Sequence, residues 1–561
     1  MKYASNNIRN ILIAGHAGSG KTTLTEALVY FSGAAERMGR VEDGTTISDF
    51  DPEEAKRKAS LSASVVPVEY EGIKYNLIDA PGLFDFEAGE YEGIRAAESV
   101  LVCVSGRSGV TVGAEKAFQL ARKNGKATMV FISKCDLENA NYFKILEEMK
   151  IKFGSTVCPC VVPAKLDDGT PVYINLFSQK TFKYESGKQI QVELPDIGHR
   201  FQGLSEAIAE TDDELMEKFF GGEPFTTEEI VEGMRKGVKD GLITPVFCGS
   251  AVNQQALDML LFNMHKLLPS PQHDAAILAE NASGEPVELH CDETEPTAAY
   301  VFKTVADPFV GKLSYLRVIS GKVTGGAALV NARTGETEKI GKPLTVIGKK
   351  QVETDGIGAG DIGAVAKLVS AKTGDTLCDA SRVVKLPAAT FPLPSLFMAV
   401  TVAKKGDEGK ISSALARLME EDPTLSYINN AETHQQIIGG LGEQHLDVVK
   451  AKLKNKFGVE IGLEAPRIAY RESIRKACQK QGRHKKQTGG HGQFGDVVIN
   501  FEPCDSEQVV FEEKVFGGSV PKNFFPAVEK GVRLAAEKGV LAGYPVVGLK
   551  ATLLDGSYHP V

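Results

Sequence analysis

The stretch IRNILIAGHAGSGKTTLTEALVYF, Ile8 to Phe31, decides the fold of the first part of the chain. It begins with an apolar, β-favouring run from Ile8 to Ala14, passes through a glycine-rich turn and continues with the periodicity of an amphipathic helix. The turn, Gly15 to Thr22, has the form GxxxxGKT, in which backbone N–H groups surround phosphate oxygens and the lysine supplies a cation. The succession of strand, loop and helix therefore predicts a nucleotide phosphate site, with a plain glycine-rich turn as the alternative.

A second phosphate motif follows the apolar segment KYNLIDAPG, which predicts a strand ending at Asp79. Asp79 and Gly82 form a DxxG turn, which by itself is common. The Asp79 carboxylate can hold Mg²⁺ through water, and the Gly82 N–H can meet a terminal phosphate because glycine lets the backbone come close. Leu83 follows, at a position that normally needs a polar side chain to orient a water molecule. Whether the protein hydrolyses a nucleotide or only holds one therefore depends on Leu83.

Two further strand ends carry residues that can recognise a base. The strand ATMVFI leads into SKCD, Ser133 to Asp136, where Asp136 can accept from the N1 and N2 donors of guanine. The strand in TPVFCGSA ends with Gly249 to Ala251, whose N–H groups can read guanine O6. Four strand-terminal motifs in this order place a ligand at the carboxyl ends of a mostly parallel sheet. Guanine is the expected base, although Ser133 stands where GTPases normally use asparagine.

The composition bounds the class of protein. A chain of 561 residues with 42% hydrophobic and 24% charged residues is typical of a globular protein with roughly four domains of about 150 residues. The start MKYASNNIRN lacks the succession of a signal peptide, and no apolar run is long enough to cross a bilayer. We therefore expect a cytoplasmic protein without a membrane partner. A monomer is expected separately.

Charge and cysteine usage narrow the choice of partners and metals. Nine cysteines without a CxxC pair indicate reduced structural thiols, and Cys158 and Cys160 are interpreted as buried thiols rather than as metal ligands. The net charge of -9 argues against nucleic-acid binding over the whole surface. The segment from Arg475 to Lys486, however, holds six Lys and Arg residues and no acidic one. It is either a local polyanion contact or a solvated basic loop.

Changes of pattern divide the chain into domains. The stretch between Asp136 and Ser250 is longer than one βα unit needs, which predicts an inserted subdomain. Short β-rich runs with glycine turns predict a β-barrel, and two strand–helix–strand repeats predict a ferredoxin-like α+β domain. The expected divisions are 1–270 with an insertion at about 155–240, a linker at 271–292, a barrel at 293–385, the ferredoxin-like domain at 394–470 and a fourth domain at 471–561.

The helices of the ferredoxin-like region are predicted from their apolar spacing. ISSALARLMEED places Ile411, Leu415, Leu418 and Met419 on one helical face. In the second repeat, an apolar stripe of the same kind ends at Gly458, which predicts the helix stop. Both helices are therefore expected to cover the same sheet.

The order and wording of these motifs resemble bacterial elongation factor G over essentially the whole chain. The most specific matches are GHAGSGKTT, DAPGLFDF, ADPFVGKLSYLRVISG, GDTLCD, IIGGLGEQHLD, GGHGQFGDVV and LAGYPVV. The resemblance implies a multidomain α/β fold: a P-loop GTPase domain with an inserted subdomain, a β-barrel, a ferredoxin-like domain and a partial α+β fourth domain whose tip enters the decoding centre. It also implies ribosome-stimulated GTP hydrolysis in translation elongation, with Mg²⁺ and with 16S and 23S rRNA and ribosomal proteins as partners.

Several residues depart from the pattern of that family. Gly18 replaces an aspartate of its P-loop, and Leu83 replaces its histidine. Lys58, Ala59 and Ser60 replace its Gly-Ile-Thr, a match that rests on spacing before Asp79, and Ser60 still offers a hydroxyl for Mg²⁺. The combination indicates a divergent elongation-factor-G-like paralogue. The resemblance also implies a fifth domain that the sequence does not contain, so we expect a C-terminally truncated form.

The motifs together give the expected site. The residues expected to contact GTP or GDP are Gly15, His16, Ala17, Gly18, Ser19, Gly20, Lys21, Thr22, Thr23, Asp79, Ala80, Pro81, Gly82, Leu83, Ser133, Lys134, Cys135, Asp136, Gly249, Ser250 and Ala251. The expected magnesium ligands are Thr22, Ser60 and Asp79. The expected catalytic residues are Lys21, Thr22, Ser60, Asp79 and Gly82.

Three functions remain open from the sequence. The first is a ribosome-associated translational GTPase whose hydrolysis is weakened by Leu83. The second is a GTP-dependent ribosome-binding switch that does not turn over. The third is a ribosomal protection protein that ejects tetracycline. The segment GGHGQFGDVV argues against this third function, because it resembles the tip loop of a translocase.

Overall fold

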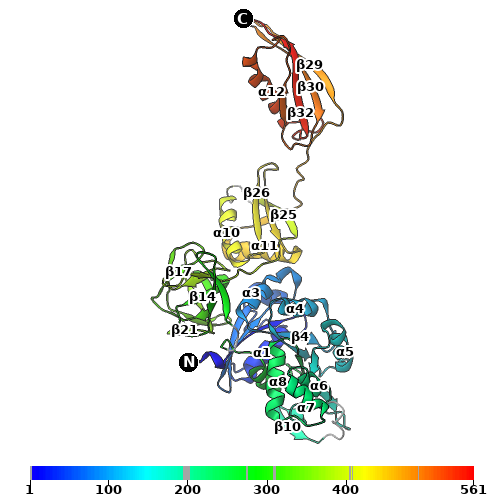
Figure 1. The fold of residues 1–561 in the computed structure, drawn as a ribbon, viewed down its shortest axis with the longest axis vertical. Coiled ribbons are helices and arrows are strands. Elements are labelled where there is room, and N and C mark those ends of the chain that lie inside the picture. The colour runs from blue at the N-terminus through cyan, green and yellow to red at the C-terminus, as the bar shows by residue number, and fades with distance from the viewer. Residues whose placement is uncertain are drawn as a thin grey trace. The chain divides into compact units, whose positions relative to one another are not determined.

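The chain forms two compact units. The computed structural model describes residues 3–193, 202–272, 276–307, 311–402, 406, 408–490 and 492–560. One unit comprises Met1–Ile428 and Ile438–Glu464, and the other comprises Asn429–Ile437 and Ala465–Val561. In Figure 1 the first unit is coloured mainly blue to yellow and the second mainly orange to red.

A twisted, mostly parallel sheet forms the centre of the first domain. Its order is β2-β3-β1-β4-β5-β11-β6, and only the pair of β2 and β3 is antiparallel among these pairings. Every residue of β1, β3, β4 and β5 is buried, as expected for strands covered by helices on both faces. The strands are β1 (Ile8–Ala14), β2 (Ser64–Tyr70), β3 (Ile73–Asp79), β4 (Ser99–Ser105), β5 (Ala127–Ser133), β6 (Val157–Pro159) and β11 (Thr244–Cys248).

The register of these strands brings their carboxyl ends to one edge of the sheet. Ile13 of β1 lies beside Asp79 of β3, and Ser105 of β4 lies beside Ser133 of β5. The predicted motifs therefore follow neighbouring strand ends. The helices of this domain are α1 (Lys21–Phe31), α2 (Pro52–Arg57), α3 (Ala88–Ala96), α4 (Val112–Lys123), α5 (Tyr142–Phe153) and α9 (Leu257–Leu267).

The predicted insertion lies between β6 and β11 and shares the hydrophobic core of the first domain. Its antiparallel sheet has the order β10-β9-β8-β7, and α6, α7 and α8 follow it in the chain (Figure 1). The strands are β7 (Val161–Lys165), β8 (Pro171–Asn175), β9 (Lys180–Glu185) and β10 (Lys188–Val192). The helices are α6 (Gln202–Ala209), α7 (Asp213–Phe220) and α8 (Thr227–Lys239).

The barrel contains antiparallel sheets, the longest with the order β18-β17-β23-β14-β15-β22-β19-β20. Its strands are β14 (Ala298–Asp307), β15 (Gly311–Ser320), β16 (Lys322–Thr324), β17 (Ala328–Asn331), β18 (Thr337–Lys339), β19 (Leu344–Ile347), β20 (Lys350–Glu353), β21 (Gly356–Gly358), β22 (Ile362–Ala366), β23 (Thr376–Cys378) and β24 (Val384–Lys385). Within the segment expected as a linker, β12 (Ile277–Asn281) and β13 (Pro286–Leu289) form a hairpin that pairs with β24. Backbone pairing overrides the polar, turn-rich composition there, because a hairpin needs only one inward-facing row of side chains.

Buried ion pairs join the barrel to the first domain. Lys303 of β14 lies 2.8 Å from Glu92 of α3, and both side chains are nearly inaccessible to solvent. Lys74 of β3 lies 2.7 Å from Asp361, just before β22. Removing one partner of such a pair leaves an uncompensated buried charge. The two pairs therefore join the barrel to α3 and to β3, on either side of the DxxG turn.

The third domain has the strand and helix order of a ferredoxin-like fold. Its sheet order is β26-β27-β25-β28, and its elements are β25 (Leu396–Val402), α10 (Glu408–Glu421), β26 (Ser426–Asn430), β27 (Gln435–Gly440), α11 (Glu443–Phe457) and β28 (Ile461–Glu464). Ile411, Leu415 and Leu418 are buried in its core, as predicted. Met419 was wrongly predicted to share that face: it is 37% exposed, because it falls beyond the edge of the apolar stripe. Gly458 ends α11 in the left-handed conformation at φ 66°, as predicted.

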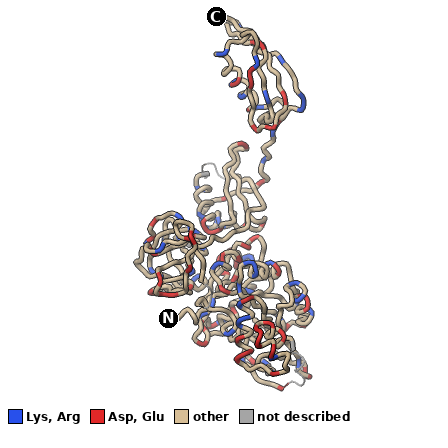
Figure 2. The backbone as a smooth tube through the Cα atoms, viewed as in Figure 1, with Lys and Arg blue, Asp and Glu red and all other residues tan. Residues whose placement is uncertain are grey.

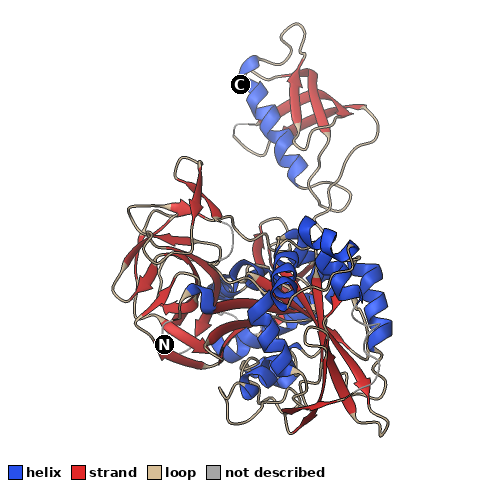
Figure 3. Cartoon of the chain, turned by 60° about the horizontal axis from the view of Figure 1, so that its bottom comes forward, coloured by secondary structure: helices blue, strands red, loops and turns tan. Residues whose placement is uncertain are grey.

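The second unit is an α+β domain in which α12 lies along the sheet (Figure 3). The sheet order is β29-β30-β32-β31, and α12 packs on it through Phe525, Val528 and Val532. The elements are β29 (Cys478–Lys486), β30 (Gln493–Pro503), β31 (Val510–Glu513), α12 (Phe525–Glu537) and β32 (Leu549–Ser557).

The basic segment of this unit is a strand, not the loop that we considered as its alternative structure. All nine residues of β29 are exposed along the edge of the sheet, and the backbone tube in Figure 2 is blue at its Lys and Arg positions. Cross-strand pairing with β30 explains the extended backbone despite the high charge. Gln493 and Phe494 begin β30, although the segment GGHGQFGDVV that contains them resembles a tip loop, so the turn is shorter than that resemblance implies.

Candidate nucleotide-binding site

The P-loop between β1 and α1 depends on its glycines. Gly15, Gly18 and Gly20 have φ values of 135°, 74° and 96°, which L-residues rarely adopt. A Cβ on Gly15 would also come within 2.5 Å of the Cys103 carbonyl oxygen. Lys21 is buried, and its Nζ donates to the carbonyl oxygens of Gly15 at 2.8 Å and His16 at 2.9 Å. The loop therefore wraps around a lysine ammonium, the arrangement expected for a phosphate site.

Lys21 stands among buried carboxylates. Desolvation lowers the pKa of Lys21, and Asp79, Glu90 and Asp49 oppose this shift by their negative charge. Conversely, burial raises the pKa of Asp79 to about 7, assisted by repulsion from Asp49 and opposed by Lys21. The site thus holds buried carboxylates whose charged form a cation would favour.

The predicted magnesium ligands meet at one place. The Thr22 and Ser60 hydroxyl oxygens lie 3.1 Å apart, although 38 positions separate them in the sequence. Both carboxylate oxygens of Asp79 are buried, and the Thr22 and Ser48 hydroxyl groups face them. In the described part of the chain, neither Asp79 oxygen has a hydrogen-bond partner. Hydroxyl and carboxylate oxygens are the donors that Mg²⁺ prefers. These residues therefore fit a bound Mg²⁺.

Gly82 of the DxxG turn lies against the P-loop. The Ala17 N–H donates to the Gly82 carbonyl oxygen at 2.9 Å. A Cβ on Gly82 would lie 2.6 Å from the Ala17 nitrogen and would clash with Lys21 Nζ. Only glycine allows this approach, so the turn closes the phosphate end of the site.

The predicted base-reading motifs gather at the other end of the P-loop. The Ser133 hydroxyl donates to the Ser19 carbonyl oxygen at 2.5 Å, and Lys134 Nζ donates to the Gly18 carbonyl oxygen at 2.8 Å. The Cys135 N–H donates to the Gly249 carbonyl oxygen at 3.2 Å. The structure thus brings the SKCD segment and the Gly249–Ala251 segment together beside the P-loop. Asp136 is exposed at their junction.

Leu83 lies in an apolar cluster rather than beside a polar partner. It is partly buried and packs with Leu61, Phe86 and Val448, the last from α11 of the third domain. Phe84, next in the chain, contacts the His16 ring at 5.7 Å between ring centroids. The position that would orient water is therefore part of a contact between domains.

Three site residues escaped the sequence analysis. Asp49 is buried, and its carboxylate faces the Ser60 hydroxyl, but it lies in a segment, SDFDPEE, without a recognisable pattern. Asn253 donates to the Asp136 carboxylate at 3.0 Å from the turn after Ala251. Glu90 of α3 is buried near Lys21. Of these three residues, Glu90 could have been identified from the sequence by its position on the helix that follows the DxxG turn.

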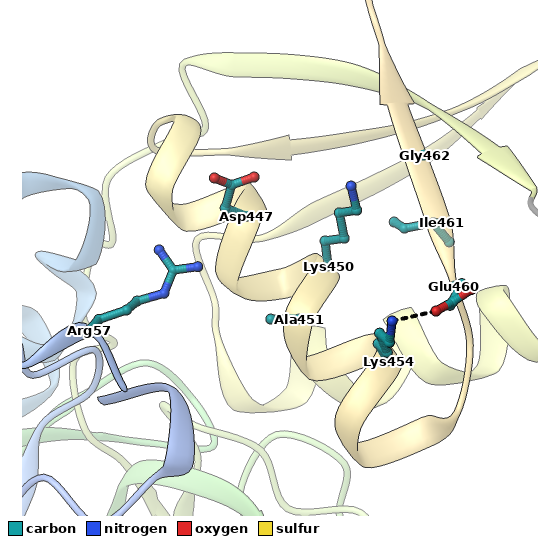
Figure 4. Close-up of a pocket in the computed structure, with 8 residues that line it drawn as sticks. All are labelled: Arg57, Asp447, Lys450, Ala451, Lys454, Glu460, Ile461 and Gly462. Carbon is teal, nitrogen blue, oxygen red and sulfur yellow. Dashed lines mark ion pairs between the residues drawn. The ribbon is translucent and has the colours of Figure 1, made fainter. Parts of the chain in front are cut away.

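A separate cavity of about 410 Å³ lies between the end of α2 and the third domain (Figure 4). Arg57 lines it from the first domain, Lys450 lines it from α11, and Lys454 of α11 forms an ion pair with Glu460 at 2.6 Å. None of the motif residues lines it, so this cavity is separate from the cluster of motif residues around the P-loop.

Comparisons with known proteins agree with this arrangement. The family model described as the elongation factor Tu GTP binding domain matches residues 6–270. Elongation factor G domain 2 matches residues 296–380, domain III matches residues 391–465 and domain IV matches residues 466–561. In the part of the chain that the structure describes, no helix has the length and apolar character needed to cross a membrane.

Two relatives cover nearly the whole chain. A protein of Thermotoga maritima described as "Elongation factor G-like protein" is 37% identical over 557 residues, which are 99% of this chain and 81% of the relative. A crystal structure of a protein from Thermus thermophilus superimposes with a TM-score of 0.85 at 36% identity, covering 99% of this chain and 82% of that one. Sequence and fold therefore agree across all four domains.

Proposed function

Because this chain belongs to the elongation factor G family of translational GTPases, we propose that it binds GTP with Mg²⁺, associates with the ribosome and acts in translation elongation at a translocation-like step. The convergence of Lys21, Thr22, Ser60 and Asp79 from separate segments is the observation that carries the proposal. We further propose that it works as a cytoplasmic monomer on 16S and 23S rRNA and ribosomal proteins.

Each residue of the site has a distinct role in this proposal. Lys21 supplies positive charge to the terminal phosphates, and the Gly82 N–H donates to the γ-phosphate. Thr22, Ser60 and Asp79 would hold Mg²⁺, with Asp49 facing Ser60 behind them. When bound, Mg²⁺ neutralises phosphate charge that develops during hydrolysis. Asp136 provides guanine selection, since its carboxylate pairs with the donor edge of that base.

Leu83 sets the expected rate. Phosphoryl transfer to water depends mainly on positioning and charge stabilisation, for which Lys21, the Gly82 N–H and Mg²⁺ are the proposed groups. Leu83 has no group that can orient water, and a positioned proton-transferring group typically contributes about 10² to 10⁴ in rate. We therefore expect tight GTP binding, negligible hydrolysis by the free protein and slow hydrolysis on the ribosome.

A second candidate function is a GTP-dependent ribosome-binding switch that does not turn over. The apolar cluster of Leu83 with Leu61, Phe86 and Val448 favours it, because this packing links the DxxG turn to the third domain without any catalytic group. In that case GTP would act through binding alone. Both candidates share nucleotide-dependent ribosome association and differ in hydrolysis.

Sedimentation with ribosomes tests the association that both candidates require. With GTP present, the protein should pellet with ribosomes, and with GDP it should remain mostly in the supernatant. Lys21→Ala, which removes the phosphate cation, should pellet equally poorly with either nucleotide. The proposal would be contradicted if the protein pelleted equally with GTP and with GDP, or if it did not pellet with ribosomes under any condition at low salt.

A further inference from the structure

Glu90 is a buried carboxyl group that the proposed mechanism does not use. It lies on α3, eight positions after Gly82, and is 9% exposed. Its side chain lines a small cavity together with Gly82, Leu83 and Phe84 of the DxxG turn, and with Gly113 and Lys116 of α4. Burying a carboxyl group is costly unless a specific neighbour compensates it, so its surroundings indicate its role.

The compensating neighbour is the P-loop itself. Lys21 is the principal charge that favours the ionised form of Glu90, and the backbone N–H of Gly15 faces the same carboxylate. Glu87 on the same helix opposes ionisation and Lys116 of α4 favours it. The His16 ring of the P-loop lies against Gly113, which lines the same cavity from α4. The geometry agrees, because Gly82 lines the same cavity as Glu90 and also lies against Lys21 Nζ, which itself donates to the Gly15 and His16 carbonyl oxygens. Glu90 and Lys21 therefore lie on either side of the DxxG glycine.

Glu90 stands at the end of the P-loop that receives the terminal phosphate. The base-reading segment meets the loop at Gly18 and Ser19, through Lys134 and Ser133. The DxxG turn meets it on the other side, through Ala17 and Lys21. Because α3 continues from that turn, Glu90 approaches from the side where GTP carries a phosphate that GDP lacks.

We propose that Glu90 is a specificity-determining residue that weakens binding of GTP relative to GDP, by competing with the γ-phosphate for Lys21. This inference rests on the proposed function. The ionised carboxylate and an added phosphate repel each other in a site shielded from water. Protonation of Glu90 removes the repulsion, and burial already raises the pKa of Glu90 to about 7. GTP binding therefore takes up a proton at Glu90, whereas GDP binding does not.

Calorimetry with GTP and with GDP, each with Mg²⁺, tests the proposal on the full chain at pH 8. Glu90→Gln keeps the shape and removes the charge, so it should raise affinity for GTP at least roughly tenfold, or about 1.4 kcal/mol. Its affinity for GDP should stay within roughly threefold, which also shows that the variant is folded. Glu87→Gln, the same change in the same cavity, should leave the ratio of the two affinities unchanged.

The pH dependence gives a second readout. Between pH 8 and pH 6 the affinity of the unmodified protein for GTP should rise relative to its affinity for GDP, because protonated Glu90 no longer opposes the γ-phosphate. The same titration of Glu90→Gln corrects for the protons of GTP itself, and should show a smaller change. Equal effects of Glu90→Gln on both nucleotides, or none, would overturn the inference. If the unmodified protein binds neither nucleotide, the proposed function fails instead.

Discussion

Replacing Leu83 with histidine distinguishes two explanations for slow hydrolysis: a missing water-orienting group at this position, or a catalytic defect elsewhere in the site. The side chain at this position lies beside Gly82, which the P-loop already contacts through Ala17. A group there that orients water contributes about 10² to 10⁴ in rate when it is well placed. The histidine must leave an apolar cluster to reach water, so we expect only part of that gain: at least roughly tenfold in ribosome-stimulated single-turnover hydrolysis.

The same substitution has a cost in stability that the structure sets. Leu83 is partly buried against Leu61, Phe86 and Val448. Full burial of a leucine side chain contributes about 1.5 to 3 kcal/mol, so a partly buried one should contribute about 1 kcal/mol to the free energy of unfolding. Leu83→Ala is the matched control: it should lose similar stability in chemical denaturation and show no gain in hydrolysis. Unchanged turnover in Leu83→His, with GTP binding intact, would refute the idea of a missing aligner.

The remaining predictions concern the base, the domain interface and the basic strand. Asp136→Asn should bind GTP at least roughly tenfold more weakly in calorimetry, and equal affinity of the unmodified protein for ATP and GTP would refute guanine recognition. Lys303→Ala leaves Glu92 as a buried unpaired charge and should lower the free energy of unfolding by about 3 to 5 kcal/mol in urea; a loss below about 1 kcal/mol would show that the pair is not structurally important. Removing the charges of Lys485 and Lys486 should reduce the salt dependence of ribosome binding by roughly 0.7 to 0.9 in slope per lost phosphate contact, whereas an unchanged slope would make β29 a merely solvated strand.

The parts of the fold that sequence reasoning predicts are those determined by local pattern. Ile8 to Ala14 is an unbroken β-favouring run, and it is a strand buried on both faces. The glycines of the P-loop are recognisable because their backbone geometry excludes other residues. Each phosphate or base motif directly follows a predicted strand, so a single sequence was enough to predict that the motifs meet at the carboxyl edge of the sheet.

The parts that escape are set by contacts between distant segments. Asp49 belongs to the site only because Ser60 and Asp79 come to it in the folded chain. Val448 contacts Leu83 across more than three hundred positions, and no local pattern marks that contact. The basic segment of β29 has a polar composition that favours a loop, yet its pairing with β30 makes it a strand.

Single-turnover hydrolysis of GTP, with and without ribosomes, tests the central claim most directly. The protein is loaded with GTP and Mg²⁺, and the appearance of GDP is followed over time, with Lys21→Ala as the unloaded control. The account predicts negligible hydrolysis by the free protein and an acceleration of at least roughly tenfold when ribosomes are added, slow in absolute rate because Leu83 cannot orient water. GTP that binds and pellets with ribosomes but stays intact would contradict a ribosome-stimulated GTPase and leave the non-hydrolysing switch.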